Sequence, residues 1–413
     1  MSRRNFRTLY LALLFCLVLL FSSCVKKGNS TSTVRVFKPD ASETLKIGFI
    51  VLNDENDQGY TYNFMVGMNN ALKKLRAEGY SLDLHVKRNV GEDAGCADAN
   101  GELAEEGCAI IFNNSFGFEP YMLQVASEYP NTNFVAMTNS AAQTDGNPRT
   151  YNAFASIYEG RYVSGVAAGM KLQELIENGR IKPEEAVIGY VGAYSFAEVV
   201  SGMTAFYLGA RSVCPSCTMR VQFVGSWSDP TLEAEAAQAL IDDGAVIISQ
   251  HSDNTTPATT AQKNGVYHTG YNNDMTGVAP DASLLSCRID WTEYFYTFIE
   301  NYLRGVQNPA DYTGTLSSGA VVLTKLNEAI AAPGTKEAIE RTVEDLKKGR
   351  IHVFDLSTFT IDGHTPTNLE MYDSFATVSG NATYGGYFHE SEYQSAPYFV
   401  GRIDGITWMN VAY

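Results

Sequence analysis

The sequence lacks three compact signatures by which many catalytic sites are recognised: G-x-S-x-G, H-E-x-x-H and the phosphate-binding pattern G-x-x-x-x-G-K-[ST]. Their absence lowers the expectation of an enzyme without excluding one. We therefore predict no catalytic residue and no cofactor.

Long hydrophobic runs are also missing near the N-terminus, where residues 9–21 are apolar but shorter than the roughly 20 residues that span a bilayer. Three Arg precede this run and small residues follow it, which is typical of a secretory signal. Cys24 comes next, as in a bacterial lipobox. We therefore predict a lipoprotein signal peptide at 1–23, with Cys24 lipidated. Phe21 departs from the usual Leu, so cleavage elsewhere is the alternative. Residues 24–44 are then expected to form a polar tether.

Positive charge is scarce, with 30 Lys and Arg against 46 Asp and Glu. Removal of residues 1–23 takes three Arg and leaves 27 basic residues, a net charge of −19. Such a surface repels nucleic acid and favours solubility, so we expect no nucleic-acid partner.

Cysteine is sparse, with seven residues in 413. Export would permit disulfides, and Cys96 with Cys108 could bridge across one helix, while Cys214 with Cys217 could close a tight loop. Cys287 is left over. A zinc site usually takes four protein ligands, and the first pair falls short even with the nearest His, so we predict no metal. Cys214 and Cys217 are expected on a surface connection, which disfavours a redox role.

The mature chain, about 390 residues, exceeds one ordinary core, so we expect two lobes. Short apolar runs alternate with helical patterns in two successive sets, which predicts parallel sheets with helices on both faces. The expected strands are 45–52, 82–86, 108–112, 133–137 and 151–156 in the first set, and 187–191, 219–224, 245–249 and 266–269 in the second.

We assign the first lobe to 45–157 with a return segment near 290–316, and the second lobe to 158–289 with 317–365. Residues 366–413 are rich in Tyr, Gly and Ser and form a C-terminal extension that the sequence does not place. Two similar lobes in series predict a hinged cleft.

Aromatic and polar residues recur in the loops that follow successive strands, at the sheet edge where α/β proteins bind ligands. Aromatic faces can sandwich a flat ligand, and amides or carboxylates can read its edge. This combination suits a purine, another planar heterocycle or a sugar. The alternative is structural, since several of these residues are ordinary helix caps. The predicted ligand-binding residues are Asp57, Tyr60, Asn114, Ser115, Phe116, Glu119, Phe196, Trp227, His251, Asp253, Asn272 and Asp274.

Seven segments, in order, resemble motifs of the basic membrane protein family of solute-binding lipoproteins. They are DQGYTY (57–62), SFGF (115–118), YEGRY (158–162), FYLGARSV (206–213), SWSDP (226–230), QHSD (250–253) and GYNNDM (270–275). The resemblance covers roughly residues 45–296.

The resemblance implies a type I periplasmic-binding-protein-like fold, with two doubly wound parallel-sheet lobes joined by a hinge and the ligand between them. It implies a receptor for a purine base or nucleoside that serves an ABC transporter permease, anchored by lipid in the cell envelope. In such relatives aromatics at the positions of Tyr60 and Phe196 stack on the base, and a carboxylate near Glu119 reads its edge. A sugar receptor on this fold and an envelope nucleoside hydrolase are the alternatives.

The resemblance also implies an Asp and a Lys that hold the ribose of a nucleoside. Here Asn272 stands at the expected Asp, and Ile289 lies near the expected Lys. An amide bonds a hydroxyl less strongly than a carboxylate does, and Ile cannot bond it at all. Arg288 and Asp274 could substitute, so the sequence favours a free base slightly over a nucleoside.

Overall fold

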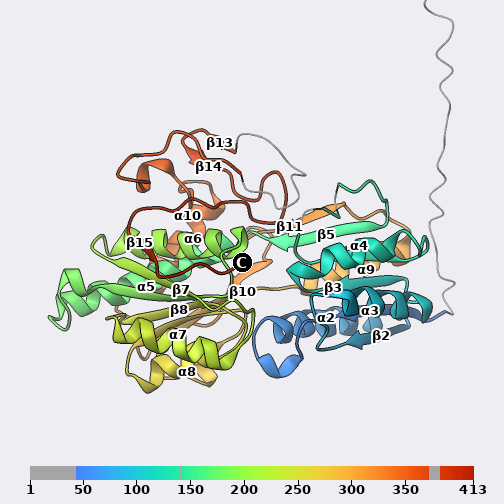
Figure 1. The fold of residues 1–413 in the computed structure, drawn as a ribbon, viewed down its shortest axis with the longest axis horizontal. Coiled ribbons are helices and arrows are strands. Elements are labelled where there is room, and N and C mark those ends of the chain that lie inside the picture. Colours follow the sequence, from blue (N-terminus) through green and yellow to red (C-terminus); the bar gives the residue numbers. More distant parts are fainter. Residues whose placement is uncertain (1–42, 140, 143, 372–381) are drawn as a thin grey trace, which may run out of the picture. The chain divides into compact units, whose positions relative to one another are not determined.

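The computed structural model describes residues 43–139, 141–142, 144–371 and 382–413 (Figure 1). The predicted signal peptide, Cys24 and almost all of the predicted tether lie outside these ranges, so they stay predictions. The described residues all belong to one compact unit. Within the described part of that unit, no helix is both long and apolar enough to cross a membrane.

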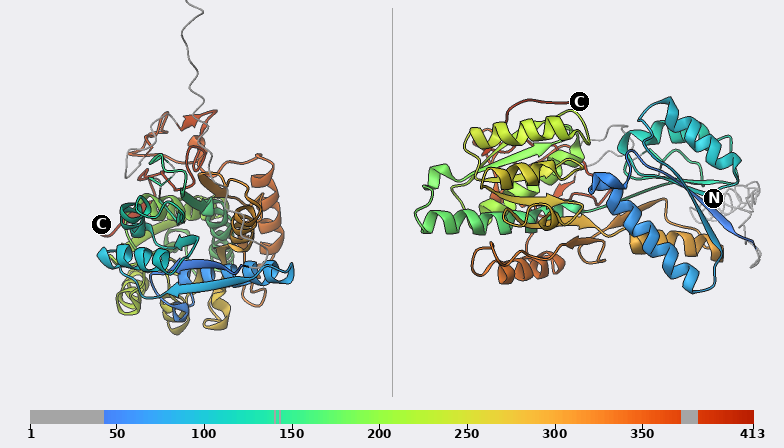
Figure 2. Two further views of the ribbon diagram at one scale, coloured as in Figure 1. Left: turned by 90° about the vertical axis from the view of Figure 1, so that its right-hand side faces the viewer. Right: turned by 90° about the horizontal axis from the view of Figure 1, so that it is seen from below.

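The first of two large sheets is fully parallel, with strand order β11-β5-β4-β3-β1-β2. Helices α2 and α9 share a hydrophobic cluster with one face of this sheet, and α3 and α4 share another with the opposite face (Figures 1 and 2). The strands are β1 (Leu45–Ile50), β2 (Leu82–Lys87), β3 (Ile110–Asn113), β4 (Asn133–Ala136), β5 (Thr150–Ala155) and β11 (Asp311–Gly314), and the helices are α2 (Tyr60–Ala77), α3 (Ala94–Glu105), α4 (Glu119–Ala126) and α9 (Thr292–Arg304).

The second sheet has strand order β12-β10-β9-β8-β6-β7-β15, and β12 is its antiparallel edge strand. Helices α5 and α6 pack on one face, while α7 and α8 pack on the other. The strands are β6 (Val187–Gly192), β7 (Thr218–Phe223), β8 (Ile247–His251), β9 (Tyr267–Tyr271), β10 (Ser283–Ile289), β12 (Val321–Leu323) and β15 (Ile406–Trp408), and the helices are α5 (Ile157–Glu177), α6 (Ala197–Val213), α7 (Pro230–Asp242), α8 (Thr256–Lys263) and α10 (Thr335–Lys347).

Two parallel-sheet lobes with helices on both faces confirm the predicted fold class. The expected strands lie within about two residues of the observed ones, but β10 was not predicted. Helix α3 begins at Ala94, because the Asp93 carboxylate caps it by accepting from the Gly95 amide at 2.8 Å.

The chain passes between the two sheets at three places. These are residues 155–157 between β5 and α5, residues 289–292 between β10 and α9, and residues 314–321 between β11 and β12. The first sheet therefore contains β11, which is distant in sequence, and the second contains β12 and β15. This connectivity is what a hinge between two lobes requires.

Helices α5 and α6 approach so closely that their backbones touch through glycine. A Cβ atom added at Gly165 would lie 1.9 Å from the Phe206 carbonyl oxygen, and one at Gly209 would lie 2.0 Å from the Tyr162 carbonyl oxygen. No side chain fits such a gap, because carbon and oxygen need more than 3 Å.

The C-terminal segment packs on the second lobe. Strand β15 pairs in parallel with β7, and Phe354, Phe388 and Phe399 join the hydrophobic cluster beneath α6. The short hairpin of β13 (Thr383–Tyr384) and β14 (Tyr387–Phe388) contributes Phe388 to this cluster. The structure thus gives a place to most of the extension that the sequence left unplaced.

The five described cysteines are all buried free thiols, so neither suggested disulfide is present. Cys96 lies in the first turn of α3, whereas the amide of Cys108 donates to the Leu103 carbonyl near the helix end at 3.0 Å. Leu103 is about 10 Å farther along the helix axis than Cys96. A disulfide requires Cα atoms within about 7 Å. Cys214 and Cys217 are 0% and 2% exposed, so their placement on a surface connection was wrong.

Glu390 makes the stability of the C-terminal segment depend on pH. Its carboxyl is 5% exposed and accepts from the backbone amides of Tyr398 and Phe399 at 2.7 and 2.8 Å. Burial raises the pKa of Glu390 from 4.5 to about 8, although these hydrogen bonds oppose the shift. The pKa of Glu390 is higher in the folded than in the unfolded state, so the stability that its protonated carboxyl contributes is complete below the unfolded pKa. This stability is lost as the pH rises through about 8.

Glu390→Gln should therefore gain stability relative to wild type as the pH rises from about 5 to about 9, by on the order of 3–5 kcal/mol. Urea unfolding at a series of pH values measures the difference. Glu235→Gln, at an exposed position of α7, serves as the control and should track wild type. A constant difference between Glu390→Gln and wild type would contradict the shifted pKa.

Candidate ligand-binding site

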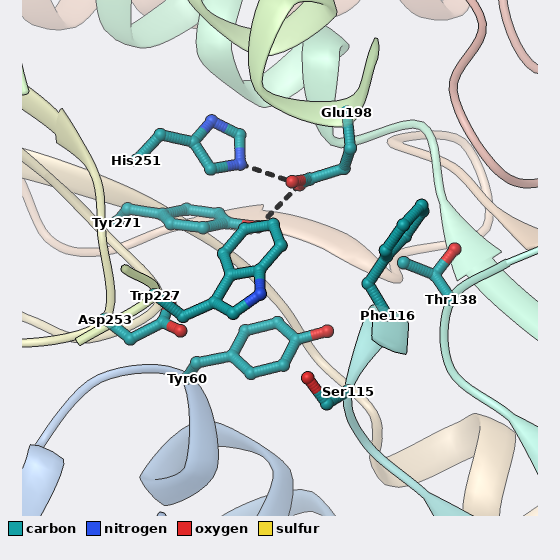
Figure 3. A pocket seen from close by; sticks show the side chains of 9 residues that line it. All are labelled: Tyr60, Ser115, Phe116, Thr138, Glu198, Trp227, His251, Asp253 and Tyr271. Carbon is teal, nitrogen blue, oxygen red and sulfur yellow. Dashed lines mark hydrogen bonds and ion pairs between the residues drawn. The ribbon is translucent and has the colours of Figure 1, made fainter. Parts of the chain in front are cut away.

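One cavity lies where the carboxyl ends of strands from both sheets meet. Its lining comes from the last residues of β8 and β9, the first turns of α2 and α6, and the loops after β3, β4, β7 and β8. This is the position expected for ligands of open α/β sheets. The nine lining residues are Tyr60, Ser115, Phe116, Thr138, Glu198, Trp227, His251, Asp253 and Tyr271 (Figure 3).

The position of Tyr60 is fixed by the turn before α2. The Asp57 carboxylate accepts from the amides of Gly59, Thr61 and Tyr62 at 2.8–3.0 Å, which places Tyr60 at the first position of the helix. Its ring packs edge-to-face on Phe64 with centroids 4.8 Å apart. Asp57, a predicted ligand residue, therefore acts as a cap and does not line the cavity.

The same turn abuts the loop after β8. A Cβ atom at Gly59 would lie 1.9 Å from the Asp253 carbonyl oxygen, and the Asn273 side chain donates to the Gln58 carbonyl at 2.8 Å. These contacts join residues of the two lobes on one side of the cavity.

Aromatic rings form the opposite wall. Phe116 stacks on Phe196 with centroids 5.3 Å apart and an interplanar angle of 21°, and Phe196 in turn stacks on Tyr194 at 5.0 Å. Phe196 was predicted to contact the ligand, but Phe116 lines the cavity and Phe196 lies behind it. Trp227 packs against Tyr194 at 5.1 Å.

A buried polar chain supports the floor of the cavity. His251 Nε2 lies 2.7 Å from Glu198 Oε1, and the Tyr271 hydroxyl donates to the same oxygen at 3.4 Å (Figure 3). Burial lowers the pKa of His251, although the Glu198 charge opposes this. The neutral ring can donate from Nε2 to Glu198 while Nδ1 accepts from the Tyr190 hydroxyl at 3.3 Å. Arg161 lies 3.8 Å from the Tyr271 ring centroid.

Asp253 is the acid most altered by this environment. It is 4% exposed, and burial raises the pKa of its carboxyl well above the usual range, with further repulsion from Asp57, Glu233 and Glu198. A protonated Asp253 both donates and accepts a hydrogen bond. Of the described side chains that line the cavity, none is Lys or Arg. The site therefore suits a neutral ligand with mixed donors and acceptors, and it offers nothing to balance a phosphate.

Several predicted residues have structural partners near the cavity. Asn114 Oδ1 accepts from the Leu52 amide at 3.0 Å, and Glu119 accepts from the amides of Ala141 and Ala142 after β4. Asp274 caps a turn by accepting from the Thr276 amide at 2.9 Å. These residues shape loops and do not line the cavity.

Asn272 differs from them. It has a φ of 63° and is 2% exposed, and neither polar atom of its amide has a hydrogen-bond partner among the described residues. Asn272 directly follows Tyr271, which lines the cavity. A buried, unsatisfied amide beside the site can gain a hydrogen bond when a ligand binds.

The structure brings together six of the twelve predicted residues: Tyr60, Ser115, Phe116, Trp227, His251 and Asp253. Sequence reasoning placed Tyr271 at the cleft without selecting it as a ligand residue, and it missed Thr138 and Glu198. Thr138 follows β4 and Glu198 follows β6, so the rule that identified the other strand ends could have found them.

The cavity is small, at about 20 Å³. On this scale a single water needs about 10–15 Å³. A purine would therefore require the walls to move apart, as a hinged pair of lobes allows.

The sequence matches the family described as ABC transporter substrate-binding protein, PnrA-like, over residues 44–353. The chain belongs to this family. A protein of Brucella abortus named as purine-binding is 32% identical over 315 residues, which cover 76% of this chain and 84% of the relative. A putative ABC transporter glucose-binding protein of Haloferax volcanii is 33% identical over 258 residues, 62% of each chain.

Solved structures of two ABC transporter solute-binding proteins share the fold. One, from Aeropyrum pernix, aligns with a TM-score of 0.61 at 13% identity and covers 78% of this chain and 94% of its own. Another, from Conexibacter woesei, aligns with a TM-score of 0.58 at 18% identity and covers 75% and 98%. Membership of the substrate-binding family confirms the resemblance drawn from the seven motifs. It also makes this chain an extracytoplasmic binding protein and not an enzyme.

Proposed function

We propose that this chain is the lipid-anchored receptor of an ABC importer for a purine, and that a free base is preferred over a nucleoside. The observation that carries the purine assignment is the cavity itself, in which aromatic rings face a buried, protonatable Asp253. The relative from Brucella, named as purine-binding, supports the same class of ligand. Lipid anchoring rests on Cys24 and the run before it.

The base would lie against Tyr60 and the Phe116–Phe196 stack. A purine presents a flat surface to aromatic rings, and such base stacking contributes about 1–3 kcal/mol for each base. Asp253 in its protonated form would donate to a ring nitrogen and accept from an exocyclic amine or ring N–H. Ser115 and Thr138, drawn on the side away from Asp253, add two hydroxyls to the lining of the cavity (Figure 3).

The preference for a free base rests on the residues at the expected ribose position. Ile289 is 1% exposed and belongs to the first hydrophobic cluster, so it offers no polar group to a sugar. Arg288, a potential substitute, lies 3.4 Å from Asp290 and is not among the lining residues. Asn272 is the remaining group. One neutral amide can form few hydrogen bonds with a ribose, so a nucleoside would gain little affinity over its free base.

Titration calorimetry with adenine, guanine, adenosine and guanosine tests this proposal. We expect at least one base to bind with one-to-one stoichiometry, and its nucleoside to bind no more tightly. If the nucleosides bind about tenfold more tightly than their bases, about 1.4 kcal/mol, the preference stated here is wrong. If none of the four binds, the purine assignment fails.

A sugar is the second candidate ligand, because one relative is named as a putative glucose-binding protein. Aromatic faces and carboxylates also bind sugars. The same calorimeter decides between the two ligand classes. Heat released by D-glucose, with none released by adenine, would favour the sugar.

A further inference from the structure

A second cavity, of about 180 Å³, lies between the start of α5, the end of α10 and the C-terminal segment. On the scale where a water needs about 10–15 Å³, this is room for a small molecule. The family match ends at residue 353, so the wall formed by Phe354 and by lining residues between 387 and 392 lies outside it. Nothing in the purine site accounts for this cavity, because the two share no lining residue.

One wall is a column of stacked rings. His352 stacks on Tyr387 with centroids 3.5 Å apart and an interplanar angle of 4°, and Tyr387 stacks on His389 at 3.8 Å. The nitrogens of His389 already face acceptors, with Nδ1 2.6 Å from a Glu392 carboxylate oxygen and Nε2 3.2 Å from the Tyr384 carbonyl. This wall therefore offers ring faces and rims, and the Glu392 carboxylate beside it is held by a hydrogen bond to the His389 ring.

Two further carboxyl groups line the cavity. Glu159 accepts from the Leu316 amide at 2.8 Å, and Glu390 accepts from two backbone amides. Burial, and after it the charges of Glu159 and Glu390, raise the pKa of the Tyr158 phenol well above the usual range. No Lys or Arg is among the described residues that line this cavity. Lys347 lies outside the lining, and its positive charge lowers the pKa of Glu159, against the effect of burial.

The C-terminal end of α10, like the carboxylates, favours a positively charged ligand in this cavity. The lining residue Leu346 lies in the last turn of α10, and the helix dipole gives this end partial negative charge that favours a cation. The Leu346 carbonyl itself already accepts from the Gly349 amide at 3.0 Å. The start of α5 carries partial positive charge, but Glu159 in its first turn offsets it.

We propose that this cavity binds a small organic cation, a primary amine or diamine, between the Tyr158 and Tyr387 rings and the carboxylates of Glu159 and Glu390. Ring faces attract ammonium groups and carboxylates pair with them, which is the chemistry that recognises such ligands. A metal ion is the less fitting occupant, because no group of three or more His, Cys, Asp or Glu in the described ranges is arranged to hold one. The proposal does not depend on the purine assignment.

Calorimetric titration of the full-length mature protein with putrescine tests the proposal. Burial raises the pKa of Glu159 to about 7 and that of Glu390 to about 8, so the titration is best made near pH 9, where both carry charge. We expect saturable binding of one putrescine for each chain. The double variant Glu159→Gln/Glu390→Gln should bind it at least about tenfold more weakly, a loss of 1.4 kcal/mol.

Glu235→Gln, which removes an exposed carboxylate of α7, is the matched control and should bind putrescine like wild type. Adenine binding by the double variant reports that it is folded, and circular dichroism reports the same if adenine is not a ligand. The proposal is overturned if putrescine does not bind wild type, if the double variant binds it equally well, or if adenine competes with it. Tighter binding of Mn²⁺ or Zn²⁺ than of putrescine at this site would also overturn it.

Discussion

Replacement of Asp253 by Ala should weaken adenine binding at least about hundredfold, a loss of about 2.7 kcal/mol. Asp253 is buried in the proposed purine site, where burial and, after it, neighbouring carboxylates raise its pKa well above the usual range. The variant would remove a donor and an acceptor from a site that excludes water, so polar atoms of the base would lose their partners. Calorimetry with adenine measures the effect.

Asp253→Asn separates the protonated acid from an ionised one. An amide also donates and accepts, so this variant should keep binding within about tenfold of wild type if Asp253 is protonated. Asp274→Ala is the control, because Asp274 caps an exposed turn and lines no part of the cavity. A variant with Asn that binds as poorly as the one with Ala would show that Asp253 acts as a carboxylate.

Gly165→Val should cost more than about 3 kcal/mol of folding stability or prevent the protein from accumulating. The added side chain would have to occupy the space of the Phe206 carbonyl oxygen, 1.9 Å from the new Cβ atom. Because the obstacle is backbone in α6, relief requires the two helices to separate, and the cluster beneath α6 would lose contacts along its length. Urea unfolding of wild type and variant gives the free-energy difference.

Gly101→Ala provides the matched comparison. Gly101 also lies inside a helix, but the nearest atom to an added Cβ there is the Tyr129 hydroxyl at 3.8 Å. This variant should gain about 0.5–1 kcal/mol, since Ala favours a helix more than Gly does. Equal effects at the two positions would show that helix propensity, and not the contact between α5 and α6, decides the outcome.

The fold class could be predicted because buried parallel strands leave a strong pattern. Residues 45–50 and 187–192 are short apolar runs followed by amphipathic helices, and this alternation alone implies helices on both faces of a sheet. The same rule placed Tyr60, Ser115 and Asp253 at the edge that binds ligands. Applying this rule requires only the local sequence pattern, and no contacts between residues that are distant in sequence.

What could not be predicted depends on contacts between residues far apart in sequence. The resemblance gave the stacking role to Phe196, but Phe116 lines the cavity and Phe196 stacks on Phe116. Asp57 is a different case, because its partners are local and capping was the structural alternative that the sequence already offered. The pairing of β15 with β7 joins residues about 190 positions apart, and a three-residue strand carries no pattern of its own.

The three passages of the chain between the sheets mean that neither lobe is a contiguous stretch of sequence. Residues 43–156 made alone would lack α9, whose Phe295 lies 5.6 Å from Phe49 and 5.0 Å from Phe112 between ring centroids. Such a fragment would expose its core and aggregate. A protease cut within residues 314–321 would have a milder result, since two covalent connections would still tether the lobes. The nicked protein should migrate as one species under native conditions and as two fragments once denatured.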